Sequence, residues 1–485
     1  MTSLDLRGAL DWSPAPERFP VQLPQRVHHF IDGTFVEGPT DGDFATVNPA
    51  TGARLAAVGR AGATEVDAAF AAARRALSGP WGRMSGLERG KYLYRIARRL
   101  QERAREFAVV ETMDNGKPIR ETRDIDVPSA IQHFFYYAGW ADKLGHVLRG
   151  PTPRPVGVCA QVIPWNFPLL MLAWKVAPAL AAGNTVVLKP AETTPLTAWL
   201  FAGLCQEIGL PEGVVNLVFG AGDVGAAVVG HPGADKIAFT GSTAVGRRIL
   251  EAAAGTGKRL TLELGGKGAH LVFEDADLER AADGVITGIF TNQGHVCCAG
   301  SRLLVQESVR DDLLARIERR MSVLRVGDPL DKNTDVGAIN SAAQHARIGR
   351  YLEIAADEGA EVRAVHAGAL PTEGWFHAPT LLLGVQQTDT CAREEIFGPV
   401  LSVLTFRTPD EAVAKANDTE YGLAAGLWCD KPSRLFDVAH RLSAGVVWAN
   451  GYNLFDAASP FGGVRHSGFG REGGLHGLWP YVEAS

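Results

Sequence analysis

The sequence predicts an α/β fold built on a doubly wound parallel sheet, and three observations lead to that prediction. Short β-branched runs alternate with longer helix-like stretches from Val156 to Val296, and Gly, Pro or a capping residue marks each junction. The β-branched runs are apolar along their whole length, as strands are in a parallel sheet covered on both faces. Glycine accounts for 55 of the 485 residues and is spread through apolar segments, which indicates tight turns and close backbone approaches.

Upstream of this region, the sequence predicts a surface arm and two helices that pack ahead of the sheet. Residues 1–24 mix charges with prolines and contain no apolar signal-peptide core, so they are predicted to form the arm. Thr64 is the predicted N-cap of the first helix, because Asp67 follows three residues later. The second helix is predicted from about Lys91 to Thr112.

The predicted sheet and its continuation divide the chain into two α/β domains that meet near Gly265–Gly266. The strands are VGVCAQVI, NTVVLKP, VVNLVFG, DKIAFTG, RLTLELG and AHLVFE, and helices at 168–182, 195–208, 223–231 and 244–254 separate the first five. A long helix follows Asp277 to about Gln293. The strand SRLLVQ, a helix at 309–324 and a further α/β series to Trp448 complete the second domain.

Charge and cysteine content exclude several classes of function. The 48 basic residues face 54 acidic ones without a basic run, so binding to nucleic acid is not expected. The uncharged stretch Pro155–Trp174 is long enough to span a membrane, but its prolines favour a buried strand, a turn and a helix. The six cysteines form no CxxC pair, which predicts free thiols, a reducing, cytoplasmic location and no metal site; they are Cys159, Cys205, Cys297, Cys298, Cys391 and Cys429.

Two glycine-rich loops join a strand to a helix and are candidate phosphate sites. The first, from Gly220 to Gly225, matches the dinucleotide fingerprint, but FTGST stands where the acidic partner belongs, so a bare turn is an equal alternative. The second, at 239–246, offers free N–H groups at a helix N-terminus and the hydroxyl of Ser242. A plain strand-to-helix turn is the alternative there.

Lys189 and Glu192 in KPAETTP follow the carboxyl end of a predicted strand, the edge where open α/β sheets bind ligands. Lys189 can bond ribose hydroxyls. Glu192 can accept a hydrogen bond from an adenosine 2′-OH and would repel a 2′-phosphate. For either residue alone, a solvated loop is the simpler interpretation.

Three further residues are candidates for covalent chemistry. Cys297 lies in NQGHVCCAGSR between a helix and a strand, although most buried cysteines only pack. Glu263 is a carboxylate in an otherwise apolar strand, where burial is costly without a role. Asn166 in PWNFP offers an amide donor of the kind that a developing oxyanion needs.

These motifs occur in one order together with others. PWNFP, KPAE, FTGST, LELGGK, CxAGSR, EEIFGPV and SPFGG extend over about Val27 to Tyr481, and the chain resembles the aldehyde dehydrogenase superfamily in them. The resemblance implies a Rossmann-like NAD-binding domain and a catalytic α/β domain. It divides the chain into 1–24 as an arm, 25–137 with 155–264 as the NAD-binding domain, 265–450 as the catalytic domain, and 138–154 with 451–485 as an oligomerisation hairpin and C-terminal segment.

The resemblance also implies a role for individual residues. Cys297 is the implied nucleophile, Glu263 the general base and Asn166 the oxyanion donor. The implied cofactor residues are Ile163, Trp165, Lys189, Glu192, Gly225, Phe239, Gly241, Ser242, Val245, Gly246, Gly265, Gln344, Arg347, Glu395 and Phe397. The implied substrate tunnel consists of Phe167, Met171, Trp174, Val296, Cys298, Phe455 and Phe461 and contains no Lys or Arg.

The implied reaction is oxidation of a small aldehyde to its carboxylate with NAD as cofactor, through a thiohemiacetal and a thioester. Glu192 disfavours NADP, and the tunnel favours an apolar aliphatic or aromatic aldehyde, although Met171 and Trp174 are equally compatible with ordinary core packing. The alternatives are a CoA-acylating dehydrogenase, which has no use for Glu263 as a base, and a non-catalytic structural relative.

Two features depart from the family pattern. His295 stands where the family commonly has Gln, and we expect no catalytic effect from it. Only LGHVLRGPTPR separates AGWADK from PVGVC, and the chain stops at YVEAS without a long final strand. Because both halves of the oligomerisation element are reduced, the expected assembly is a homodimer.

Overall fold

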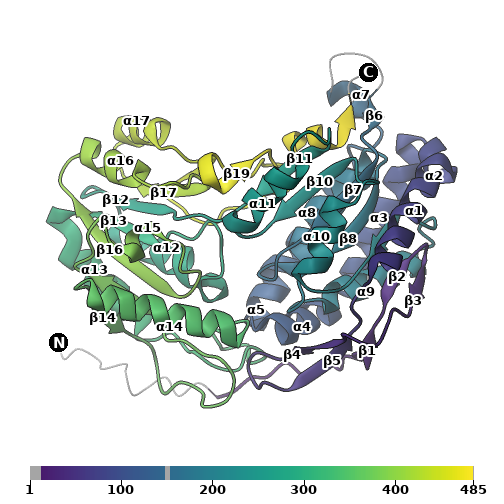
Figure 1. Ribbon diagram of the computed structural model, residues 1–485. Coiled ribbons are helices and arrows are strands. Elements are labelled where there is room, and N and C mark those ends of the chain that lie inside the picture. The colour runs from purple at the N-terminus through teal and green to yellow at the C-terminus, as the bar shows by residue number, and fades with distance from the viewer. Residues whose placement is uncertain (1–12, 148–152, 484–485) are drawn as a thin grey trace.

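The computed structural model describes residues 13–147 and 153–483. The start of the predicted arm, part of the predicted hairpin and the last two residues, at 1–12, 148–152 and 484–485, lie outside the described residues. The elements form two α/β bodies, each with its own large sheet (Figure 1).

The first sheet confirms the doubly wound prediction. Its strand order is β19-β11-β10-β7-β8-β9-β2-β3, and the five strands from β11 to β9 are parallel. Their bounds are β7 (Val158–Val162), β8 (Thr185–Lys189), β9 (Val215–Leu217), β10 (Lys236–Thr240) and β11 (Arg259–Glu263). The edge strands are β2 (His29–Ile31), β3 (Thr34–Val36) and β19 (Gly468–Phe469). The chain order reverses between β7 and β10, so a crevice opens at the carboxyl ends of these two strands.

Helices cover both faces of this sheet. The connecting helices are α8 (Pro168–Ala181), α9 (Leu196–Glu207), α10 (Gly222–Gly230) and α11 (Thr243–Ala253). The helices before the sheet are α1 (Ala63–Ser78), α2 (Pro80–Arg83), α3 (Gly86–Glu102), α4 (Ala104–Asn115), α5 (Ile119–Glu121), a π-helical turn (Thr122–Asp126) and α6 (Val127–Ala138). Every residue of α8 is buried, because the helix packs between the sheet and the layer that contains α3 and α6.

The structure corrects two predictions about the first helices. Thr64 lies inside α1, and Gly62 is the N-cap, because its backbone N–H donates to the Glu65 carboxylate at 2.7 Å. The single helix predicted from about Lys91 to Thr112 is two helices, α3 and α4. The backbone leaves the helical region at Arg103, where φ is −103° and ψ is 14°.

The second sheet has the order β14-β15-β16-β13-β12-β17-β18, and its strands are parallel except for the β14–β15 pair. The strands are β12 (Ala269–Val272), β13 (Arg302–Gln306), β14 (Glu361–Ala364), β15 (Thr380–Leu383), β16 (Val400–Phe406), β17 (Ala424–Trp428) and β18 (Val446–Ala449). Its helices are α12 (Leu278–Phe290), α13 (Arg310–Met321), α14 (Ala342–Asp357), α15 (Thr390–Arg393), α16 (Pro409–Asn417) and α17 (Pro432–Arg441). The chain passes from the first sheet to the second between Glu263 and Ala269.

Two small sheets complete the fold. One contains β1 (Arg26–Val27), β5 (Arg54–Val58) and β4 (Phe44–Val47), and the other pairs β6 (Arg154–Pro155) with β20 (Val482–Glu483). Figure 1 shows β6 and the short α7 (Leu144–Val147) beside the C-terminal end of the chain, at the top of the first body. The C-terminal segment therefore contacts two sheets: β19 joins the first large sheet, and β20 pairs with β6.

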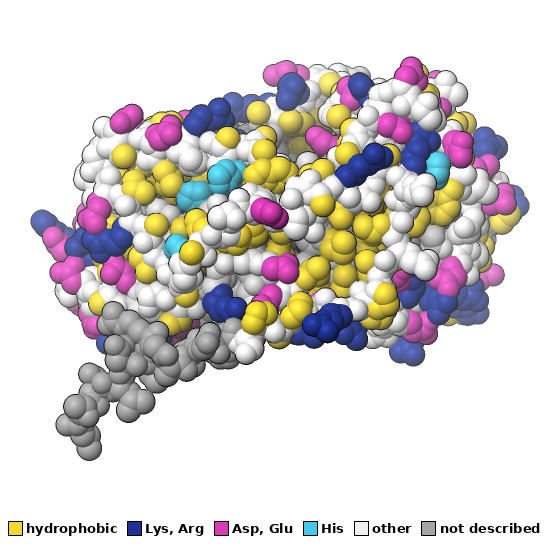
Figure 2. Space-filling model, turned by 90° about the horizontal axis from the view of Figure 1, so that it is seen from below, with side chains coloured by type: hydrophobic (Ala, Val, Ile, Leu, Met, Phe, Trp, Pro, Cys, Tyr) yellow, Lys and Arg dark blue, Asp and Glu magenta, His cyan; other side chains and the backbone are white. Residues whose placement is uncertain are grey.

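The surface is mixed in charge. On the face in Figure 2, apolar side chains gather near the middle, and basic and acidic side chains alternate around them. No helix within residues 13–147 and 153–483 is both long enough and apolar enough to cross a membrane.

Candidate active site

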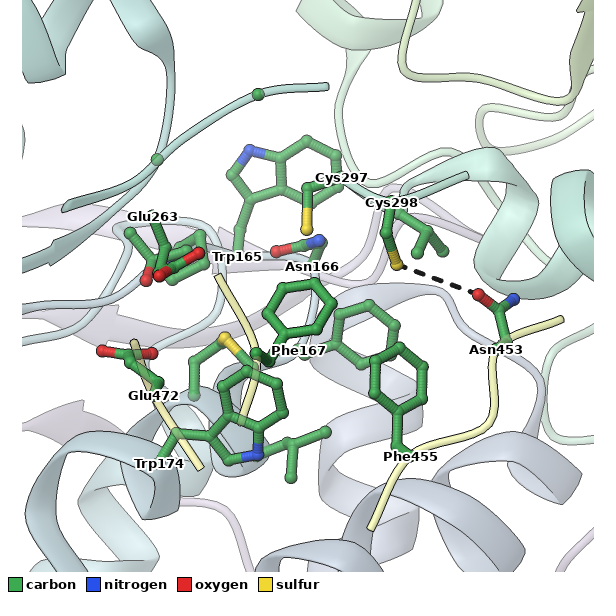
Figure 3. Close-up of a pocket in the computed structure, with 18 of the residues that line it drawn as sticks. Trp165, Asn166, Phe167, Trp174, Glu263, Cys297, Cys298, Asn453, Phe455 and Glu472 are labelled. Carbon is green, nitrogen blue, oxygen red and sulfur yellow. Dashed lines mark hydrogen bonds between the residues drawn. The ribbon is translucent and has the colours of Figure 1, made fainter. Parts of the chain in front are cut away.

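A cavity of about 510 Å³ opens at the crevice between the carboxyl ends of β7 and β10. Residues of both bodies line it, as the close-up in Figure 3 shows. This is where ligands bind in open α/β sheets, because the connections on either side of the reversal run to opposite faces. The predicted nucleophile, base and oxyanion donor all lie in its wall: Cys297, Glu263 and Asn166.

Cys297 is held by a tight loop that follows α12. A 3-10 turn over Thr291–Gly294 ends the helix, and a Cβ added to Gly294 would lie 2.0 Å from the carbonyl oxygen of Gly398. Only glycine fits there, so the loop packs closely under the thiol. The contact with the Cys298 thiol, followed by burial, raises the pKa of Cys297 well above the usual range. The raised pKa favours the thiol form of Cys297, so a base would have to take its proton before it could act as the predicted nucleophile.

Glu263 ends β11 and is buried in the cavity wall, with 4% of its surface exposed. Burial, followed by the negative charge of Glu472, raises its pKa well above the usual carboxyl range. Neither oxygen of the Glu263 carboxylate has a hydrogen-bond partner among the described residues. An unpartnered buried carboxylate is costly, and its oxygens are available to a ligand or to water.

Asn166 lies in the bend after β7. Its Nδ2 donates to the carbonyl oxygen of His295 at 2.8 Å, which fixes the plane of the amide. A primary amide has two N–H donors, so this bond leaves the second one for another acceptor. Figure 3 shows the amide and the Cys297 sulfur facing the same part of the cavity.

One end of the cavity is formed by residues predicted to bind the cofactor. Glu395 accepts from the Gly266 N–H at 3.0 Å, and burial raises its pKa to about 7. Arg347 donates to the Glu395 carbonyl at 2.8 Å, and Gln344 donates to the Phe397 carbonyl at 2.7 Å. A Cβ at Gly265 would lie 2.4 Å from the Glu395 carboxylate, so glycine at this position allows the carboxylate to pack against the backbone.

The remaining cofactor candidates lie along the same sheet edge. Trp165, Gly241 and Ser242 are in the wall of this cavity, and the others lie outside it. Lys189 and Glu192 form a pair at 3.1 Å, and Gly225 lies against the Lys189 stem. Ser242, which is in the cavity wall, caps α11 by accepting from the Val245 N–H at 3.4 Å. The others outside the wall are Ile163, Phe239, Val245 and Gly246.

The other end of the cavity is aromatic. Trp174 packs against Phe461 and Phe455 with ring centroids 5.4 and 6.5 Å apart. The structure brings the whole predicted tunnel into the cavity wall: Phe167, Met171, Trp174, Val296, Cys298, Phe455 and Phe461. Cys298 donates weakly to the Asn453 side chain at 3.8 Å.

Sequence reasoning missed several residues of the wall. Glu472 pairs with Lys175, whose Nζ also donates to Thr240 at 2.7 Å. Lys175 is the single charged residue of the otherwise apolar α8, and this isolated charge could have marked it in the sequence as a residue with a buried polar partner. The other missed wall residues include Ile125, Ser129, Gln132, His133, Thr287, Thr291, Asn453 and Asp456, and no motif marked them.

His295 lies among aromatic rings below the cofactor end. Its ring packs edge-on to Trp165 at 4.8 Å and stacks on Phe397 at 5.8 Å. Burial lowers the pKa of His295 to about 3, so the ring is neutral near neutral pH. That His295 has no catalytic effect stays a prediction.

The fold and this cavity define a two-domain α/β oxidoreductase. The chain belongs to the aldehyde dehydrogenase family, whose family model matches residues 35–485. DhaS of Bacillus subtilis is 46% identical over 94% of both chains, and the aldehyde dehydrogenase of Aspergillus niger is 44% identical over 96% of this chain and 95% of the relative. The structure of Bacillus cereus aldehyde dehydrogenase in complex with NAD+ superimposes with a TM-score of 0.91 at 42% identity, covering 94% of this chain and 95% of that one.

Proposed function

We propose that this enzyme oxidises an aldehyde to a carboxylate with NAD+ through covalent intermediates on Cys297. One observation carries the proposal: side chains from three distant segments, Asn166, Glu263 and Cys297, meet in one cavity at the reversal of a doubly wound sheet. Each has the chemistry that one step requires.

The first step is addition of Cys297 Sγ to the aldehyde carbon. Because the pKa of the thiol is raised, a base must take its proton. Glu263 is the unpartnered carboxylate proposed for this role, and the negative charge of Cys297 is one of the causes that raise its pKa. The carbonyl oxygen then becomes an oxyanion. The free N–H of Asn166 and the backbone N–H of Cys297 are the donors proposed to stabilise it.

The cofactor end supports NAD, since Gln344, Arg347 and Glu395 line the cavity there and the α11 N-terminus offers N–H groups for a phosphate. Bound NAD+ supplies the hydride acceptor. The Bacillus cereus enzyme and PnpE of Pseudomonas sp. WBC-3 have each been solved with this dinucleotide. The proposed adenosine contacts are Lys189 and Glu192, and the Glu192 carboxylate favours a free 2′-OH over a 2′-phosphate.

Loss of hydride from the adduct leaves an acyl thioester on Cys297. Once Glu263 has released the thiol proton to solvent, it takes a proton from water, which attacks the thioester carbon. The C–S bond then breaks, Glu263 returns a proton to the Cys297 sulfur, and the acid product loses its own proton to solvent and leaves as the carboxylate. A CoA-acylating enzyme, the main alternative, would not need this carboxylate. Its position in the cavity wall therefore favours hydrolysis.

The substrate class proposed is an apolar aliphatic or aromatic aldehyde. The wall around Trp174, Phe455 and Phe461 is aromatic, and the acidic residues Asp456 and Glu472 are in the same cavity wall. An aldehyde that also carries a carboxylate would meet a like charge there. We further propose a homodimer in a reducing, cytoplasmic compartment, which agrees with free thiols at all six cysteines.

The test is NADH formation with a panel of aldehydes, measured for the wild type, Cys297→Ala and Glu263→Gln. Cys297→Ala should form no NADH. Glu263→Gln should form about one NADH per site and then stall, because its thioester is not hydrolysed. Continued turnover by Cys297→Ala would refute the mechanism, and stimulation of Glu263→Gln by CoA to the wild-type rate would favour the acylating alternative.

A further inference from the structure

The loop before Cys297 has an unusual backbone. Asn292 and Gln293 are consecutive non-glycine residues in the left-handed region, with φ of 49° and 53°. Each such residue costs on the order of 1 kcal/mol or more, so surrounding contacts must hold the pair in place. Both side chains are completely buried.

The contacts of Asn292 lead directly to the predicted oxyanion donor. Its backbone N–H donates to Glu121 at 2.9 Å, and its Nδ2 donates to the backbone carbonyl of Asn166 at 2.7 Å. The same Nδ2 lies 3.4 Å from the carbonyl of His295, which accepts from the Asn166 amide. The loop therefore forms two hydrogen bonds with Asn166, one to its backbone carbonyl and one from its side-chain amide.

We infer that Asn292 is a positioning residue for catalysis: its left-handed backbone aims the side-chain amide at the Asn166 carbonyl and so fixes the oxyanion donor beside Cys297. The inference rests on the proposed function. Preorganised donors stabilise a developing charge only when they are already in place, and a misplacement of about 1 Å can cost about 100-fold in rate.

A purely conformational role is the competing explanation, because Asn tolerates the left-handed region better than most residues. Asn292→Gly separates the two, since glycine keeps that backbone conformation and removes only the side chain. The matched control is Gln293→Gly. Gln293 has the same backbone conformation, but its side chain bonds Ala338, Gly116 and Gly337 and not Asn166.

The experiment is a double-mutant cycle on the first-turnover rate of NADH formation, with Asn166→Ala as the second substitution. Asn292→Gly should lower the rate about 10- to 100-fold in the wild-type background, the range expected for a displaced catalytic group. It should have little further effect in Asn166→Ala, because the group through which it acts is gone. Gln293→Gly should change the rate by the same factor in both backgrounds.

Two readouts separate positioning from general damage. The melting temperature of Asn292→Gly should fall no further than that of the matched control Gln293→Gly, and its rate of Cys297 alkylation by iodoacetamide should stay near the wild-type value. A wild-type first-turnover rate in Asn292→Gly, or effects that multiply with Asn166→Ala, would overturn the inference. Failure of the proposed function would be seen separately, as NADH formation by Cys297→Ala.

Discussion

At the scale of single residues, the proposed base and the proposed nucleophile both have raised pKa values. Burial raises the pKa of Glu263, the contact with Cys298 and burial raise that of Cys297, and no counter-charge bonds either group among the described residues. Such shifts are typical of catalytic groups, although structural burial also produces them. Here both groups lie in the same cavity wall.

These shifts predict how the rate depends on pH. Glu263 and Cys297 react in their deprotonated forms. Because their pKa values are raised, acidification protonates them at a higher pH than usual. As the pH is lowered, the rate of thioester hydrolysis in the wild type should therefore begin to decline at a pH well above 4.3, the ordinary pKa of Glu. Single-turnover hydrolysis measured across pH tests this. A rate that stays constant down to about that pH would contradict the raised pKa of Glu263.

Glu192 predicts cofactor preference at the same scale. Its side chain is 46% exposed, so its repulsion of a 2′-phosphate is partly screened. Glu192→Gln should reduce the preference for NAD+ over NADP+ in kcat/KM by about tenfold, which corresponds to about 1.4 kcal/mol. Glu212→Gln, on an exposed loop, is the control. An unchanged ratio in Glu192→Gln would remove this residue from the adenosine site.

At the scale of elements, helix α12 connects the second sheet to the nucleophile loop. Asp277 caps it, accepting from the Glu279 and Arg280 N–H groups at 3.1 and 3.2 Å. Asp277→Ala should destabilise the protein by about 1 kcal/mol, a usual value for a lost N-cap. Urea unfolding measures this. The control is Asp283→Ala on the same helix, whose exposed carboxylate pairs with Arg320 of α13 and which should change stability less. A larger loss in Asp283→Ala than in Asp277→Ala would contradict the capping role.

The elements also show how far sequence reasoning reaches. The central strands and their helices could be predicted because apolar runs and glycine junctions are local signals. The N-cap of α1 could not, because Gly62 and Thr64 each precede an acidic residue by three positions and only the fold selects Glu65. Lys175 and Glu472 pair across 297 residues, and no local pattern reports such a contact.

The candidate site likewise contains residues that the sequence could predict and residues that it could not. Cys297, Glu263 and Asn166 were found because each residue is unusual in its own segment, and the resemblance supplied their roles. The α6 side of the cavity, with Ser129 and His133, was missed because an amphipathic helix does not reveal which of its faces borders a cavity.

At the scale of the whole molecule, the cavity lies between two α/β bodies, and the small β6–β20 sheet lies apart from it. The proposed assembly is a homodimer, for which multi-angle light scattering should give twice the chain mass of 51.8 kDa. A stable tetramer at micromolar concentration would contradict this.

The central claim is that Cys297 carries the acyl group. Intact-protein and peptide mass spectrometry of Glu263→Gln, after mixing with an aldehyde and NAD+, tests it most directly. The peptide that contains Cys297 should gain the mass of one acyl group. Hydroxylamine should remove this group, and it should be absent from the double variant with Cys297→Ala. An unmodified protein after NADH has formed, or an acyl group on another residue, would contradict it.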